Sequence, residues 1–86
     1  MTDDEYRELQ SFLASHPGIG KVIPGSGGLR KLRWAGSGHG KRGGFRLIYY
    51  WWAAVDSIAM LFIYRKNEQD DLTPAQVKLL RRAMGL

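Results

Sequence analysis

Two apolar runs close together in the chain restrict what this sequence can fold into. Phe45–Ala53 and Ile58–Lys66 are rich in the aromatic and β-branched residues that strands prefer, and a short polar turn around Val55-Asp56-Ser57 separates them. This pattern predicts an antiparallel hairpin. Both faces of the second run are apolar, so we expect it to lie at the centre of the sheet, covered on each side. Arg46 and Asp56 interrupt the apolar stretch, which favours a hairpin over a membrane-spanning helix.

Cap signals predict one helix on either side of the strands. Thr2 and Glu5 form a capping box before a helix over residues 3–14, with an apolar stripe at Tyr6, Leu9, Phe12 and Leu13. A second helix over residues 74–84 begins at Pro74 behind the cap Thr73. Its apolar stripe is Val77, Leu80 and Met84.

A further strand, Leu29–Trp34, is expected ahead of the hairpin. Alternation places Lys31 and Arg33 on one of its faces and Leu32 and Trp34 on the other. Residues 18–28 read as a turn region that sends Ile19, Val22 and Ile23 into the core. The prediction is one α+β domain over residues 1–86, with an antiparallel sheet of about three strands packed by an N-terminal and a C-terminal helix.

The charges are distributed unevenly along the chain. Between Pro17 and Val55 there are seven Lys or Arg and no Asp or Glu, within a formal net charge of +5. A field of one sign concentrates partners of the opposite sign, and nucleic acid is the commonest such partner for a small domain. The alternative is an ordinary solubilising surface, which usually mixes its signs.

Several other classes of function are excluded by composition and motif. The absence of cysteine removes disulfide frameworks, thiolate zinc sites and thiol nucleophiles, and no cofactor or metal is expected. Residues 38–43 satisfy G-x-G-x-x-G, but a strand follows them, where a dinucleotide site needs a helix. The triphosphate-binding loop fails because Arg42 stands where its Ser or Thr belongs. The N-terminus shows no signal peptide, and we expect a cytoplasmic protein without membrane association.

Three ordered motifs, GGLRKLRW, GKRGGFRLIYYW and IYRKNEQDDLT, are followed by a capped terminal helix. Together they resemble the RelE-type toxins of bacterial toxin–antitoxin modules, and most closely the HigB branch. The resemblance implies a RelE/ParE-like fold and a small, basic, metal-independent endoribonuclease (an mRNA interferase). Such an enzyme cuts messenger RNA in the A site of the small ribosomal subunit and inhibits translation. It also implies inhibition by a cognate antitoxin, here a HigA-like helix-turn-helix protein.

The resemblance also implies which residues act. By position, the catalytic residues of such toxins fall on Lys31, Arg33, Arg46 and Lys66. Further basic residues are expected to bind RNA: Arg30, Lys41, Arg42 and Arg65.

This sequence departs from the family in two places. Many relatives have a tyrosine, or a histidine and tyrosine, after the last strand, where this chain has 67-NEQDD-71. Relatives also open with a strand and a helix ahead of the helix expected at Asp3. Either the fold is complete without them, or a neighbouring chain supplies cover, or the true start codon lies upstream.

RNA cleavage without a metal needs three groups: a base for the 2′-OH, a stabiliser of phosphate charge and an acid for the leaving oxygen. Arg33 and Arg46 suit the phosphate, because a guanidinium grips it with two donors. Lys31 is the better base, since crowding by cations favours its neutral form. Lys66 or Arg65 suits the leaving oxygen, and His39 in the glycine-rich loop is a weaker candidate for the acid.

Two other functions stay open at this point. A ParE-like gyrase inhibitor on the same fold would act without cutting RNA, and a degenerate relative would bind RNA without cleaving it. Tyr50 and Trp52 share a face with Arg46 and could stack on bases, but they are assigned to the core.

Overall fold

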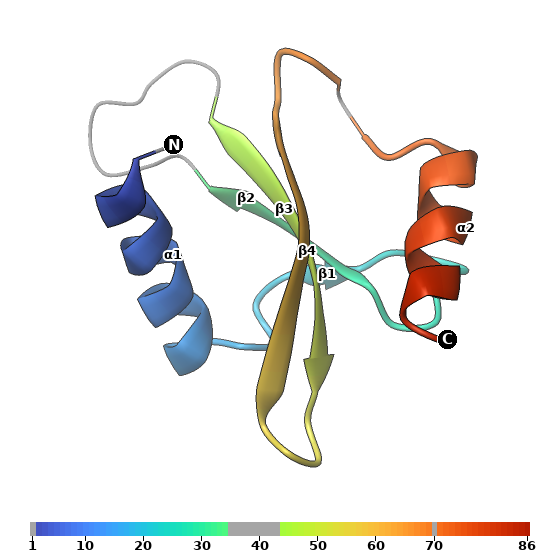
Figure 1. Ribbon diagram of the computed structural model, residues 1–86, viewed down its shortest axis with the longest axis horizontal. Coiled ribbons are helices and arrows are strands. Elements are labelled where there is room, and N and C mark those ends of the chain that lie inside the picture. Colours follow the sequence, from blue (N-terminus) through green and yellow to red (C-terminus); the bar gives the residue numbers. More distant parts are fainter. Residues whose placement is uncertain (1, 35–43, 70) are drawn as a thin grey trace.

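A computed structural model describes residues 2–34, 44–69 and 71–86. In these residues two helices lie on opposite sides of one antiparallel sheet (Figure 1). The α+β prediction is confirmed. None of the helices in the described part of the chain is long and apolar enough to cross a membrane.

The helix α1 (Asp3–Ser15) begins where its capping box predicts. The Thr2 hydroxyl accepts from the backbone N–H of Glu5, and the Glu5 side chain accepts from the backbone N–H of Thr2. Leu9 and Leu13 are fully buried, whereas Tyr6 lies at the rim with 36% of its surface exposed. These two leucines pack on Leu47 and Tyr49 of the sheet, so α1 covers one face.

The sheet has four strands within the described residues, in the order β1-β2-β3-β4. These are β1 (Lys21–Val22), β2 (Arg30–Trp34), β3 (Phe45–Trp52) and β4 (Ser57–Arg65), each antiparallel to its neighbour. The prediction of about three strands missed β1, which is only two residues long. A two-residue strand is too short for side-chain alternation to reveal it.

The expected position of the second hairpin strand is wrong, because β4 lies at the edge of the described sheet and β3 lies inside it. Its two apolar faces have another cause: α1 covers one and α2 the other. Met60 and Ile63 pack towards α1, while Leu61 and Phe62 pack with the cluster on the α2 side. The β3 partner changes from Phe62 to Met60, so Leu61 is skipped in a bulge.

The helix α2 (Pro74–Ala83) has the predicted cap, in which the Thr73 hydroxyl accepts from the backbone N–H of Gln76. Leu80 and Met84 pack against a second cluster formed by Leu29, Ile48 and Tyr64 on the other face of the sheet. Figure 1 shows α1 and α2 well separated, with the strands between them. Each face of the sheet therefore has its own small core.

The region before β2 is more ordered than a turn. The hydroxyl of the buried Ser26 donates to the carbonyl oxygen of Ile23 at 2.6 Å and accepts from the backbone N–H of Leu29 at 2.9 Å, which closes the β1–β2 turn. Only Ile23 of the three predicted core residues packs inside; Ile19 and Val22 are 47% and 51% exposed. The β3–β4 turn covers residues 53–56, earlier than expected, with Asp56 at a φ of 49°.

Candidate functional site

Side-chain alternation in β2 places Lys31 and Arg33 together on one face, as predicted, and this face is the α2 side of the sheet. Arg33 lies directly opposite Arg46 of β3, so their Cβ atoms are about 4.5–5.5 Å apart. Lys31 lies opposite Ile48, which makes it the diagonal neighbour of Arg46. Three of the four predicted catalytic residues are thus neighbours on one face.

A fourth cation of this group, on β1, was not predicted from the sequence. Lys21 of β1 is directly opposite Lys31 and therefore shares its face. A strand of two residues is too short for alternation to show which face Lys21 is on. That placement comes from the β1–β2 pairing. We call Lys21, Lys31, Arg33 and Arg46 the basic face. It contains two cross-strand pairs of like charge, an arrangement that destabilises a sheet.

Among the described residues, three members of the basic face have no carboxylate bonded to them: Lys21, Arg33 and Arg46. Arg46 is the least exposed of the three. Its side chain is half-buried, and its Nε is buried without a hydrogen-bond partner among the described residues. A buried donor without a partner costs about 1–3 kcal/mol. Arg33 opposite it is exposed. Two arginines that start from directly opposite positions can both reach one anion with their guanidinium groups.

Asp71 is the carboxylate that reaches the basic face. Lys31 Nζ donates to Asp71 Oδ1 at 2.9 Å, with 25% of the Lys31 side chain and 62% of the Asp71 side chain exposed. The hydrogen bond from Lys31 is the main cause that lowers the pKa of Asp71 below its usual 3.8. Partial desolvation opposes this shift, while the backbone N–H of Leu72 and the charges of Lys31 and Arg46 reinforce it.

The lowered pKa of Asp71 predicts how the stability of the protein depends on pH. A carboxylate whose pKa is lower in the folded state adds stability above its unfolded pKa, and this stability is lost as pH falls through the folded pKa. We therefore expect wild type to be more stable than Asp71→Asn at pH 7, with the difference shrinking as pH falls through the lowered pKa of Asp71. Urea unfolding at pH 7, 4 and 2.5 measures it. A difference that does not shrink between pH 7 and pH 2.5 would assign the effect to the amide, and not to the charge.

The segment that holds Asp71 is braced by its own side chains. Gln69 Nε2 donates to the backbone oxygen of Asp71 at 2.8 Å and to Gln76 Oε1 at 2.9 Å. Asp71 Oδ1 also accepts from the backbone N–H of Leu72 at 3.0 Å. The α2 cap therefore fixes where the carboxylate stands relative to Lys31.

The other predicted residues are placed less uniformly. Lys66 is exposed just beyond β4, and its backbone N–H donates to the Gly44 oxygen, at the end of the sheet where Arg46 lies. Arg65 is on the α1 side, where its guanidinium lies over the Phe45 ring at 5.4 Å. Lys41, Arg42 and His39 lie outside the described residues.

Arg30 is also on the α1 side, away from the basic face. Its Nη1 donates to the backbone oxygens of Gly18 and Gly20, at 3.1 and 2.8 Å, and its guanidinium lies 5.7 Å from the Trp51 ring centre. It ties the segment before β1 to the sheet. The structure does not bring Arg30 and Arg65 together with the predicted catalytic residues.

Three aromatic residues lie on the same side of the sheet as the basic face. Tyr64 of β4 is directly opposite Arg46, and its ring belongs to the buried cluster under α2. Sequence reasoning gave Tyr64 no role because its relation to Arg46 depends on the β3–β4 register. Tyr50 and Trp52 are on the same face further along β3, with ring centres 5.1 Å apart.

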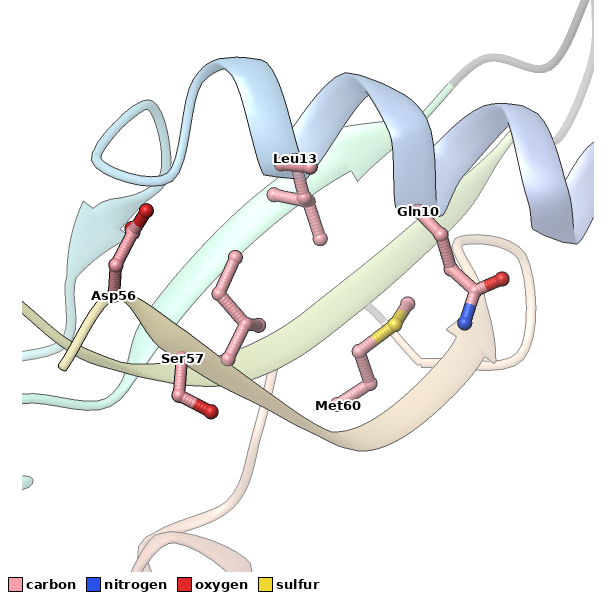
Figure 2. Close-up of a pocket in the computed structure, with 7 residues that line it drawn as sticks. Gln10, Leu13, Asp56, Ser57 and Met60 are labelled. Carbon is pink, nitrogen blue, oxygen red and sulfur yellow. The ribbon is translucent and has the colours of Figure 1, made fainter.

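A cavity of about 300 Å³ lies elsewhere, between α1 and β4 (Figure 2). Gln10 and Leu13 point into it from the helix, and Asp56, Ser57 and Met60 line it from the strand side. Its charged group is a carboxylate, and no cation lines it among the described residues. It does not suit a polyanion.

The described residues contain no group of three or more His, Cys, Asp or Glu side chains that could hold a metal ion. A scan of the chain against models of known protein families finds no model that matches it. The basic face offers its own cations for chemistry: Arg33 and Arg46 for an anion's charge, and Lys31 beside them for proton transfer or further charge.

Proposed function

We propose that this protein is a RelE-like toxin of a toxin–antitoxin module: a metal-independent endoribonuclease that cuts messenger RNA in the ribosomal A site. The observation that best supports the proposal is the Arg33–Arg46 pair with Lys31 as its diagonal neighbour. Like charges held opposite one another destabilise the sheet. A bound anion would offset this repulsion, so anion binding is the function that best accounts for the pair.

The proposed reaction is an attack of the ribose 2′-oxygen on the adjacent phosphorus. The P–O5′ bond breaks, leaving a 2′,3′-cyclic phosphate on one product and a 5′-hydroxyl on the other. Arg33 and Arg46 stabilise the charge that builds on the phosphate. Lys31 takes the proton of the 2′-OH, and Lys66 supplies a proton to the leaving oxygen.

The contact with Asp71 bears directly on the role of Lys31. Lys31 Nζ is bonded to a carboxylate 2.9 Å away, so Lys31 can reach the 2′-OH only once this contact is broken. Because the substrate phosphate is itself an anion, displacing Asp71 does not by itself free Lys31 to act as a base. The same contact supports a second candidate function, in which the protein binds RNA through a permanently charged Lys31 and does not cleave it.

Lys31→Arg separates these two functions. Arginine keeps the charge but cannot act as a base near neutral pH. We expect the rate of RNA cleavage to fall about 10²–10⁴-fold, the range for loss of a general base, with RNA affinity within a few-fold of wild type. Cleavage by Lys31→Arg at the wild-type rate would show that Lys31 contributes charge alone.

Expression in cells tests the function as a whole. Induction of this protein without an antitoxin is expected to arrest translation and to leave transcripts cut within codons. Intact transcripts with normal translation would contradict the proposal. Intact transcripts with a DNA-damage response would instead indicate a ParE-like gyrase inhibitor.

A further inference from the structure

A second cavity, of about 330 Å³, opens at the β1 edge of the sheet and includes Lys21 and Lys31 of the basic face. It is adjacent to the Arg33–Arg46 pair but does not include it. It combines two lysines and one carboxylate with an apolar wall; the lining residues are Lys21, Val22, Ile23, Pro24, Lys31 and Asp71.

The charges around this cavity are unbalanced. Lys21 and Lys31 are directly opposite each other in the β1–β2 pair. Asp71 bonds to Lys31, while Lys21 forms no ion pair with any described residue. Like charges opposite one another are unfavourable, and a single carboxylate offsets only one of the two.

The spacing of the two like-charge pairs matches a strand of nucleic acid. Lys31 and Arg33 are two residues apart on β2, which is about 7 Å along the strand. Consecutive phosphates of an extended single strand can span this separation. The polyanion would then run along β2, with one phosphate at Arg33–Arg46 and the next at Lys21–Lys31. The exposed Val22 and its neighbours Ile23 and Pro24 would face the sugar or base.

We propose that this cavity is a second phosphate-binding subsite, formed by Lys21 and Lys31, which Asp71 fills with its own carboxylate until the phosphate of a single-stranded nucleic acid displaces it. The inference rests on the proposed function in one respect: both phosphates belong to the same strand. In this proposal the Asp71 carboxylate, held in place by the α2 cap, is an internal competitor of the phosphate. It weakens the binding of short or weakly charged anions.

Lys21→Gln tests the subsite, with Lys78→Gln as the matched control. Lys78 is exposed on α2 and lines a neighbouring groove. The probe is a fluorescent eight-residue oligodeoxyuridylate, which lacks the 2′-OH and so cannot be cleaved by 2′-OH attack. We expect Lys21→Gln to reduce the slope of log K against log[salt] by about 0.7, the value of one phosphate contact on a single strand. Lys78→Gln should leave the slope unchanged. Equal slopes for the two variants would overturn the subsite.

Asp71→Asn tests the internal competitor, with Glu68→Gln as its control. Glu68 is on the same connection, but its carboxylate accepts from the backbone N–H of Arg65. Asparagine keeps an acceptor for the Leu72 N–H and loses the charge. We expect Asp71→Asn to bind the oligodeoxyuridylate about 2–5-fold more tightly, since an exposed ion pair worth up to about 1 kcal/mol no longer competes. Unchanged binding would overturn the proposal. Weaker binding would also overturn it, and would show that Asp71 positions Lys31 for the ligand.

The outcome of these binding measurements is independent of whether the protein cleaves RNA. A reduced slope for Lys21→Gln, with no RNA cut by wild type, would keep the subsite and contradict the endoribonuclease. RNA cleavage by wild type, with identical slopes for Lys21→Gln and Lys78→Gln, would do the reverse.

Discussion

Arg46→Met is expected to lower RNA cleavage about 10²–10³-fold, the loss typical of one charge-stabilising donor, while making the protein more stable. Methionine is unbranched and apolar, so it can fill the half-buried position of the arginine stem. It removes the repulsion from Arg33 and the buried Nε that has no partner among the described residues. We expect a gain of about 1 kcal/mol, which raises Tm by about 4–8 °C in a domain of this size.

The paired change in rate and stability distinguishes a functional arginine from a structural one. Arg7→Met, on the exposed surface of α1, is the control, with unchanged cleavage and stability within about 0.5 kcal/mol. Wild-type cleavage by Arg46→Met would show that Arg46 does not contact the reacting phosphate. A loss of stability would show that its guanidinium has a structural partner, and the like-charge argument would be wrong.

The second large effect is expected at Gly20, which is buried against β3. Its backbone N–H donates to the Tyr49 hydroxyl at 2.9 Å, and that hydroxyl donates to the Pro17 oxygen at 2.8 Å. A Cβ on Gly20 would lie 2.8 Å from the Tyr49 ring and 3.1 Å from the backbone oxygen of Lys31. We expect Gly20→Ala to lower the free energy of unfolding by about 1–3 kcal/mol, the usual effect of overpacking. Thermal and urea unfolding measure it.

Gly18→Ala is the matched control, two residues away in the same segment. Its Cβ would approach Trp51 at 3.3 Å and meet only side-chain atoms, so we expect a loss below about 1 kcal/mol. In the double variant Gly20→Ala with Tyr49→Phe, the missing hydroxyl removes one of the close contacts, and the two effects should be less than additive. Equal losses for both alanine variants would show that the segment can shift away from β3 without strain.

Local patterns in the sequence predict the elements and the faces of β2 and β3. Both capping boxes involve residues three apart, so they can be read without knowledge of the fold. Alternation likewise places Lys31 with Arg33, and Arg46 with Tyr50 and Trp52. The position of a strand within the sheet depends on its neighbours, and it could not be predicted from local patterns. The two apolar faces of β4 indicated a central strand, whereas β4 is an edge strand of the described sheet that two helices cover.

The parts of the basic face that escaped prediction are those set by distant pairing. Lys21 joins it only through its register with Lys31, and Tyr64 only through its register with Arg46. Asp71 meets Lys31 across 40 residues of chain, through a connection whose path the sequence does not indicate. The crowding argument for Lys31 as a base counted cations alone, and for that reason it omitted the one carboxylate that touches it.

The chemistry of the cut ends tests the central claim most directly. Purified wild-type protein is added to ribosomes that hold a defined messenger RNA, and the ends of the products are identified. The proposed reaction predicts cleavage within the A-site codon, with a 5′-hydroxyl on one fragment and a 2′,3′-cyclic phosphate on the other. RNA that is bound but stays intact, or fragments with 5′-phosphate ends, would contradict 2′-OH attack at the basic face.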